Sequence, residues 1–168
     1  IPLMELLEEV GKDAARFFYV SRSNDQHLNF DLDLAKAKNN DNPVYYIQYA
    51  HARIHKVFQE LNHNNFNFDK NSGISNLGLL STNHETEIIT KLGDYPNVIA
   101  LSADNYSVHS LANYLLEVAQ LFHSYYNAHR FLVADNEIRN ARLALIAAVA
   151  IVIKDGLSLL GVSAPEQM

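Results

Sequence analysis

The sequence of 168 residues contains neither cysteine nor tryptophan, and it has only six glycines and four prolines. Without cysteine, the chain cannot form a disulfide bond, a thiolate metal site or a cysteine nucleophile. The fold must therefore depend on packing alone. This composition is compatible with a reducing compartment, and we expect a cytoplasmic location.

A basic charge balance, a membrane span and a recognisable catalytic motif are also missing. The formal net charge is −6, whereas proteins that bind nucleic acid commonly carry a basic patch. The longest apolar run, LALIAAVAIVI at 143–153, is shorter than the ~20 residues that cross a bilayer, so it predicts a buried helix and no membrane association. There is no glycine-rich phosphate loop and no GxSxG motif, and we therefore predict no catalytic residue in this chain.

The composition that is present indicates an ordinary globular protein. Hydrophobic residues make up 48% of the chain and charged residues 19%, which argues against disorder. A chain of this length is one domain, or one domain with an appendage, and can bury roughly 70% of its unfolded surface. It begins with Ile1 and Pro2, without an initiator methionine or a basic leader, so we expect it to be a piece of a longer protein.

Apolar residues recur at helical spacing over most of the chain, which predicts an all-α fold, an antiparallel helix bundle. The helices are expected at residues 2–19 with a break at Gly11, and at 43–62, 83–92, 96–103, 108–132 and 136–160. Residues 62–78, rich in asparagine and glycine, are predicted to be a loop too polar to pack. The tail, residues 161–168, is either an ordered stop or a frayed end.

The segment LNFDLDLA, residues 28–35, alternates in its first half like a short strand. Asp31 or Asp33 could instead cap a short helix that runs through Lys38, and a cap is favoured over paired acid–base chemistry. The cluster at 39–43 breaks any helix, because Pro43 disfavours helical geometry at Asn42. We place a domain boundary there, which divides the chain into residues 1–40 and 41–168.

The stretch NPVYYIQYAHARI, residues 42–54, places aromatic and charged side chains beside a core face. Tyr46, Tyr49 and Arg53 fall on one flank of that face, at helical spacing. Aromatic rings stack on unpaired bases at ~1–3 kcal/mol each, and an arginine can bind a phosphate or a base edge. Tyrosines also border cores where no ligand binds, and the pattern alone favours this plainer interpretation. The core face itself is predicted to consist of Ile47, Ala50, Ile54, Val57, Phe58 and Leu61.

A second cluster occurs in LFHSYYNAHRFL, residues 121–132, where Tyr126 lies beside the apolar stripe with His129 and Arg130 nearby. Two such clusters in one bundle favour a shared aromatic surface.

His51 and His55, at i and i+4, could chelate zinc. No third ligand lies at a fixed spacing, so we predict no metal site.

Three strings carry a resemblance to a known family: GKDAARFFYVSRSNDQHLNFDLDLAKAKNNDNPVYYIQYAHARI, LANYLLEVAQLFHSYYNAHRFL and ARLALIAAVAIVIKDGLSLLGVSAPEQM. They resemble the C-terminal part of class I arginyl-tRNA synthetases, over nearly the whole chain. The resemblance implies a ligase that activates arginine with ATP and magnesium and esterifies it to tRNA. The family's ATP motifs and arginine pocket lie upstream, so this chain alone is expected to be inactive and to hold no cofactor.

By the same resemblance, residues 1–40 are the tail of the catalytic body and residues 41–168 are an anticodon-binding domain of the DALR type. The residues expected to cradle the anticodon bases are Tyr46, Tyr49, Arg53, Tyr126 and Met168. The turn that contains Asn40, Asp41 and Asn42 resembles a loop that rearranges when tRNA binds and couples the anticodon site to the catalytic body.

The expected partners are an arginine-accepting tRNA and the upstream catalytic domain of the same chain, in a monomer. Many relatives have proline before the histidine where this chain has Val108 and His109, and many have arginine where it has Gln167. The alternative is a structural helical module that docks a protein partner through its tyrosines.

Overall fold

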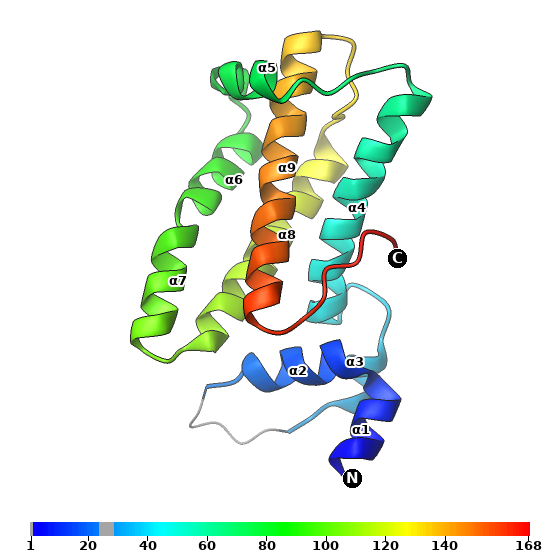
Figure 1. The fold of residues 1–168 in the computed structure, drawn as a ribbon, viewed down its shortest axis with the longest axis vertical. Helices are drawn as coiled ribbons and strands as arrows, with labels where there is room; N and C mark the ends of the chain where they lie inside the picture. Colours follow the sequence, from blue (N-terminus) through cyan, green and yellow to red (C-terminus); the bar gives the residue numbers. More distant parts are fainter. Residues whose placement is uncertain (1, 24–28) are drawn as a thin grey trace.

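The computed structural model describes residues 2–23 and 29–168, and every regular element in these ranges is helical (Figure 1). The all-α prediction is confirmed. The elements are α1 (Leu3–Val10), α2 (Lys12–Val20), α3 (Leu32–Lys36), α4 (Pro43–His63), α5 (Lys70–Ser75), the 3₁₀ helix η1 (Leu77–Leu79), α6 (Asn83–Gly93), α7 (Tyr95–Asp104), α8 (Val108–Ala128) and α9 (Asn136–Leu159).

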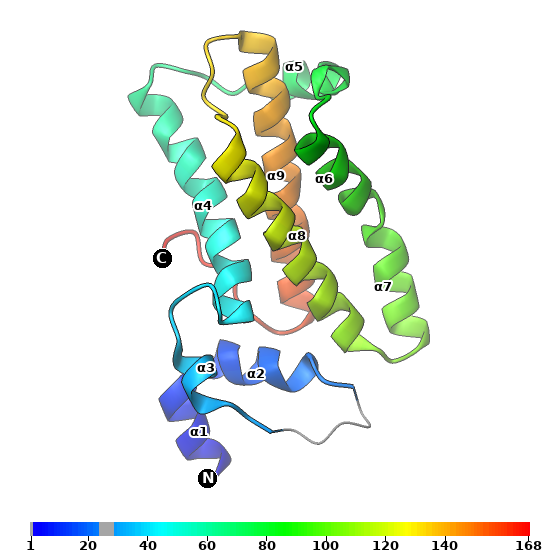
Figure 2. The same ribbon diagram turned by 180° about the vertical axis from the view of Figure 1, so that it is seen from behind.

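The three longest helices, α4, α8 and α9, pack on one another and form the centre of the bundle (Figures 1 and 2). Helices α6 and α7 lie along α8, and the short α1–α3 lie at the end of the bundle where α4 begins. The predicted core face of α4 is buried except for the half-buried Phe58. No helix of the described segments is both long and apolar enough to span a membrane.

Polar side chains fix where the main helices begin. Asn42 caps α4 by accepting a hydrogen bond from the Val44 amide, and Pro43 occupies the first turn, where its missing N–H costs nothing. Thr82 and Glu85 form a reciprocal capping box at the start of α6. Asp135 caps α9 by accepting from the Ile138 amide at 2.9 Å.

Residues 62–78 are not the unpacked loop that the sequence predicts. They contain α5 and most of η1, and α5 packs across the end of α9. Gly73 allows this close approach, because a Cβ there would lie 2.4 Å from the Asn140 carbonyl oxygen. Asp69 caps α5, and its amide donates to the buried Asn140 side chain at 3.0 Å. The polar residues therefore cap a packed segment instead of preventing it from packing.

Two other boundaries differ from the predictions. Helix α8 ends at Ala128 and not at 132, because the extended backbone at His129 turns Phe131 into the core, 4.9 Å from the Tyr125 ring. Near residue 30 the described residues 29–31 are not a strand, and Leu28, the first residue of that prediction, lies outside the described residues. Asp31 caps α3, which ends at Lys36 instead of continuing to Lys38.

Candidate nucleic-acid interface

The guanidinium of Arg53 lies between two tyrosine rings contributed by different helices. Its Cζ atom is 4.5 Å from the ring centre of Tyr49, one turn earlier on α4, and 4.2 Å from that of Tyr126 on α8. Nη2 of Arg53 also donates to the Tyr49 hydroxyl at 2.9 Å. We call this arrangement of Tyr49, Arg53 and Tyr126 the Arg53 stack. It forms because α4 and α8 pack side by side.

His123 of α8 lies next to the Arg53 stack and is 4% exposed. Its Nδ1 lies 3.1 Å from Nη1 of Arg53, and its Nε2 lies 3.1 Å from the Tyr46 carbonyl oxygen. Arginine can only donate, so Nδ1 accepts and Nε2 carries the hydrogen that the carbonyl receives. Burial, and to a smaller extent the charge of Arg53, lower the pKa of His123, while the Tyr46 carbonyl opposes them. The imidazole is therefore neutral at pH 7.

A pocket of roughly 360 Å³ opens beside the Arg53 stack, within the size range of ligand pockets. Arg53 uses two N–H groups on protein acceptors, and in residues 2–23 and 29–168 it forms no ion pair. Its remaining donors and its full charge are therefore available to a ligand in this space. We call the space the Arg53 pocket; its lining residues are Tyr49, Ala52, Arg53, Lys56, Gln59, Tyr126, Glu166, Gln167 and Met168.

The C-terminal tail is ordered and is held against α4 (Figures 1 and 2). Gln48 donates from Nε2 to the Ser163 carbonyl oxygen at 2.9 Å and to Asp13 of α2 at 3.0 Å. The buried His51 donates from Nδ1 to the Pro165 carbonyl oxygen at 2.9 Å. These bonds carry Met168 to the edge of the Arg53 pocket.

The histidine pair His51 and His55 has ring centres 4.5 Å apart. Throughout the described parts of the chain, no group of three or more histidine, cysteine, aspartate or glutamate side chains is arranged to hold a metal ion. His51 has a protein partner in Pro165. Burial lowers the pKa of His51, and the hydrogen bond to Pro165 opposes this shift.

Four of the five side chains predicted to form the site line the Arg53 pocket: Tyr49, Arg53, Tyr126 and Met168. Tyr46 does not line it. Its half-buried ring packs against His123, with ring centres 4.3 Å apart. Burial raises the pKa of Tyr46, partly offset by the charge of Arg53. Tyr46 therefore lies outside the pocket lining and packs against His123, which in turn contacts Arg53.

The predicted coupling turn contains one buried residue and two exposed ones. Asn42 is 3% exposed, and its side-chain amide donates to the carbonyl oxygens of Ala35 at 3.2 Å and Ala37 at 2.9 Å. Asn40 and Asp41 are exposed. Asn42 thus ties the end of α3 to the start of α4. It also lines a cavity of roughly 680 Å³, whose wall includes residues of α1–α4 and Met168.

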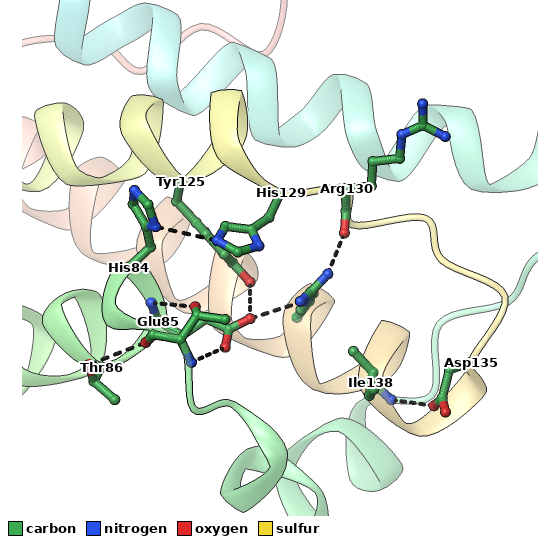
Figure 3. Close-up of polar contacts among 10 residues, drawn as sticks. His84, Glu85, Thr86, Tyr125, His129, Arg130, Asp135 and Ile138 are labelled. Carbon is green, nitrogen blue, oxygen red and sulfur yellow. Dashed lines mark hydrogen bonds and ion pairs between the residues drawn. The ribbon is translucent and has the colours of Figure 1, made fainter.

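Tyr125, the neighbour of Tyr126, is fully buried, and Figure 3 shows its side chain directed toward Glu85. Its hydroxyl donates to Oε1 of Glu85 at 2.9 Å, and Nε of Arg142 donates to the same oxygen at 3.0 Å. We call these three residues the Glu85 clamp. Burial alone would raise the pKa of Glu85, but hydrogen bonds from Thr82, Tyr125 and Arg142 together lower it. The clamp fixes α8 to α6 and α9.

Beside the clamp, Nε2 of His129 lies 3.3 Å from Nδ1 of His84, as Figure 3 shows. His129 and Arg130, which the sequence places near Tyr126, line a separate hollow of roughly 300 Å³ together with Tyr126. Tyr126 therefore lies between two hollows.

Sequence reasoning missed His123, although its position three residues before Tyr126 places both side chains on one side of α8. It also missed Lys56, Gln59 and Glu166 as lining residues.

A family model described as the DALR anticodon binding domain matches residues 47–168. The chain belongs to this family. The matched range of this DALR domain contains four residues of the predicted site, Tyr49, Arg53, Tyr126 and Met168, together with His123. Tyr46 lies one residue before it.

Similar proteins extend the likeness beyond the DALR domain. The chain is 60% identical over all 168 residues to an arginine–tRNA ligase of Coxiella burnetii and 55% identical to one of Thioalkalivibrio sulfidiphilus. It covers 28% and 29% of those two proteins, so it spans less than a third of their length. A solved arginyl-tRNA synthetase of Thermus thermophilus superimposes with a TM-score of 0.79 at 29% identity, over 95% of this chain and 27% of that one.

Proposed function

We propose that this chain is the C-terminal part of an arginine–tRNA ligase and that it recognises the anticodon of an arginine-accepting tRNA. The observation that carries the proposal is the Arg53 stack: a guanidinium between two tyrosine rings, at a pocket lined also by the C-terminal tail. Membership of the DALR family and the likeness to arginine–tRNA ligases support it.

The chemistry of the Arg53 pocket suits an unpaired base. A tyrosine ring stacks on any base at ~1–3 kcal/mol, and the free guanidinium N–H groups of Arg53 can donate to base or phosphate oxygens. Met168 supplies a flexible thioether, which adapts to a ring surface. Such a local pocket needs little net positive charge, so the formal charge of −6 is compatible with RNA binding here.

The proposal divides the chain by function. Residues 1–40 belong to the catalytic body and residues 41–168 form the anticodon-binding domain, with the Asn40, Asp41 and Asn42 turn between them as the coupling element. Asn42 supports this role, since it bonds to both sides of the boundary. A change in the conformation of this turn would alter the contacts between α3 and α4.

In the whole enzyme, arginine, ATP and magnesium bind to the upstream catalytic domain of the same polypeptide. We propose a monomeric cytoplasmic enzyme that joins arginine to tRNA. This chain covers less than a third of the length of the relatives, which supports the assignment of catalysis to an upstream domain. The chain of 168 residues alone is expected to show no arginine-dependent exchange between ATP and pyrophosphate.

The test is a titration of the chain with an anticodon stem–loop of an arginine-accepting tRNA. A second stem–loop differs from it only at the central base of the anticodon. We expect the matched stem–loop to bind more tightly. Equal affinity for both would contradict anticodon recognition. Absence of binding to either stem–loop would favour the alternative of a module that docks a protein.

A further inference from the structure

We propose that His123 is a positioning residue of the Arg53 pocket: in its neutral form, with the hydrogen on Nε2, it holds the Arg53 guanidinium between Tyr49 and Tyr126, and protonation of its ring releases that guanidinium. The RNA-binding part of this inference rests on the proposed function. The geometry around His123 does not depend on the proposed function.

The two hydrogen bonds of His123 require one tautomer. Nη1 of Arg53 must donate, so it can approach Nδ1 at 3.1 Å only when Nδ1 carries no hydrogen. The Tyr46 carbonyl oxygen must accept, so Nε2, also at 3.1 Å, must carry one. Only the neutral ring protonated at Nε2 satisfies both partners. The ring is also fixed from the sides, with ring centres 4.3 Å from Tyr46 and 5.5 Å from Tyr49.

This contact sets the orientation of Arg53. The ring contacts, with Cζ 4.5 Å from the centre of Tyr49 and 4.2 Å from that of Tyr126, place the guanidinium but do not set the directions of its N–H groups. The bonds from Nη1 to His123 and from Nη2 to the Tyr49 hydroxyl set these directions. The remaining N–H groups then have defined directions in the pocket. A bound base or phosphate would therefore meet an already oriented donor set, which favours affinity.

Protonation of His123 would add a hydrogen to Nδ1 and a positive charge beside Arg53. Both changes oppose the contact, and no described neighbour of the ring offers a compensating carboxylate. The groups that face His123 across the α4–α8 interface are Arg53, Tyr46 and Tyr49, of which only Arg53 is charged. Lys56 and Glu166, the other charged groups of the pocket, lie with Arg53 in its lining.

Burial lowers the pKa of His123, so the neutral form persists below the ordinary histidine value of about 6.5. The oriented state of Arg53 is present at neutral pH and is lost when the pH falls through the lowered pKa. Binding of RNA should then weaken on the acid side, and alkaline pH up to about 8 should have no effect through this group.

Two substitutions separate the two bonds. In His123→Asn, the amide oxygen is as many bonds from the backbone as Nδ1, so it can accept from Arg53 at any pH. In His123→Gln, the amide nitrogen corresponds to Nε2 and can donate to the Tyr46 carbonyl, while Arg53 loses its acceptor. His63→Asn, at the exposed end of α4, is the matched control.

The first measurement needs no RNA. Nitrogen-15 correlation spectra of the histidine side chains, with His123→Gln used to assign the resonance, report which nitrogen carries the hydrogen. We expect the Nε2–H tautomer for His123 and, on acidification, a shift of the Tyr49 and Tyr126 ring resonances that follows its titration. An Nδ1–H tautomer, or tyrosine resonances that do not respond, would overturn the inference whatever the RNA does.

The second measurement is the affinity for the anticodon stem–loop between about pH 5 and pH 8. For His123→Gln we expect binding at pH 7 to be weaker by about tenfold, equivalent to about 1.4 kcal/mol. His123→Asn should stay within about threefold of the original chain and lose its acid dependence, while His63→Asn should keep it. Circular dichroism at each pH verifies that the fold is intact.

The outcomes distinguish this inference from the proposed function. If the unchanged chain binds the stem–loop but His123→Gln binds equally well, the inference is wrong and the function stands. If the chain binds no stem–loop at any pH, the proposed function fails, and the spectra still decide whether His123 positions Arg53.

Discussion

Arg53 and Arg142 each belong to a cluster with a tyrosine of α8, but the two clusters differ in how the positive charge is balanced. Arg142 donates to the carboxylate of Glu85, whose side chain is only 2% exposed, and the Tyr125 hydroxyl binds the same oxygen. Arg53 contacts neutral groups, the Tyr49 hydroxyl, the His123 imidazole and two ring faces. The first charge is neutralised inside the protein, and the second is not.

Helix α8 contributes one side chain to each cluster, Tyr125 to the Glu85 clamp and Tyr126 to the Arg53 stack. Tyr125 and Tyr126 are adjacent in sequence, so their side chains leave α8 in different directions. Tyr125 lies in the core as part of the Glu85 clamp (Figure 3), whereas Tyr126 lines the Arg53 pocket. The balanced charge of Arg142 fixes α8 to its neighbours, and under the proposed function the unbalanced charge of Arg53 serves a ligand.

The largest effect should come from breaking the Glu85 clamp. Replacing Arg142 by methionine leaves the buried carboxylate of Glu85 without its cation, and losing one partner of a buried pair costs about 3–5 kcal/mol. We expect this loss in the free energy of unfolding, measured by urea denaturation. Arg130→Met is the matched control, because Arg130 is exposed, and it should change the stability by less than about 0.5 kcal/mol. Equal stability of the two variants would contradict the difference between the clusters.

The Arg53 stack should show the reverse behaviour. Tyr49→Ala and Tyr126→Ala each remove one stacking surface, and we expect each to weaken binding of the anticodon stem–loop by about 1–3 kcal/mol. Because both rings lie at the edge of the core, the fold should survive, as thermal melting would test. Tyr106→Ala is the control, since Tyr106 is 86% exposed and lies away from the pocket lining. A variant that unfolds without a specific loss of RNA binding would mean that its tyrosine is structural.

The tail should have a smaller effect that depends on where it is cut. Deleting residues 167–168 removes Gln167 and Met168 from the Arg53 pocket. A thioether–ring contact is worth about 0.3–1.5 kcal/mol, so stem–loop binding should weaken by about that amount while the melting temperature stays unchanged. Deleting residues 165–168 also removes the carbonyl partner of the buried His51, and stability should then fall as well. If both truncations bind and melt like the original chain, the tail is dispensable.

The smallest effect should be the pH dependence of stability. Burial lowers the pKa values of His51 and His123, so the unfolded chain binds protons more readily than the folded one. Their contribution to stability is complete above about pH 6.5 and is lost as the pH falls through their folded pKa values. Urea denaturation at a series of pH values measures this loss. His123→Asn should reduce the slope in that range, and an unchanged slope would contradict the assignment of a neutral His123.

The helical architecture could be predicted because it depends on local signals. Apolar spacing gave α4, α6 and α9 within one residue at each end, and Pro43 marked the start of α4. The short α5 could not be predicted, because its packing depends on the absence of a Cβ at Gly73 and on the side chain of Asn140, which is distant in sequence. Contacts between residues far apart in the chain leave no periodic signal.

The Arg53 pocket could be predicted only in part, because it too depends on contacts between residues far apart in the chain. A helical wheel groups Tyr46 with Tyr49 and Arg53, because it records only the angle around α4. It carries no information on what covers each turn of the helix, and here His123 of α8 lies against Tyr46. The approach of Tyr126 to Arg53 and the return of the tail both depend on tertiary packing. The sequence and the resemblance thus proposed candidate residues, of which four line one pocket, but they did not indicate that Tyr46 lies outside its lining.

The position of Met168 has a practical consequence for anyone who prepares this protein. Met168 lines both the Arg53 pocket and the larger cavity whose wall includes residues of α1–α4. A purification tag fused after this residue would begin at the rim of both spaces and could obstruct them. Binding assays should therefore use material tagged at the amino end, or with the tag removed. A carboxyl-terminal fluorophore, by contrast, would be well placed to report whether the pocket is filled.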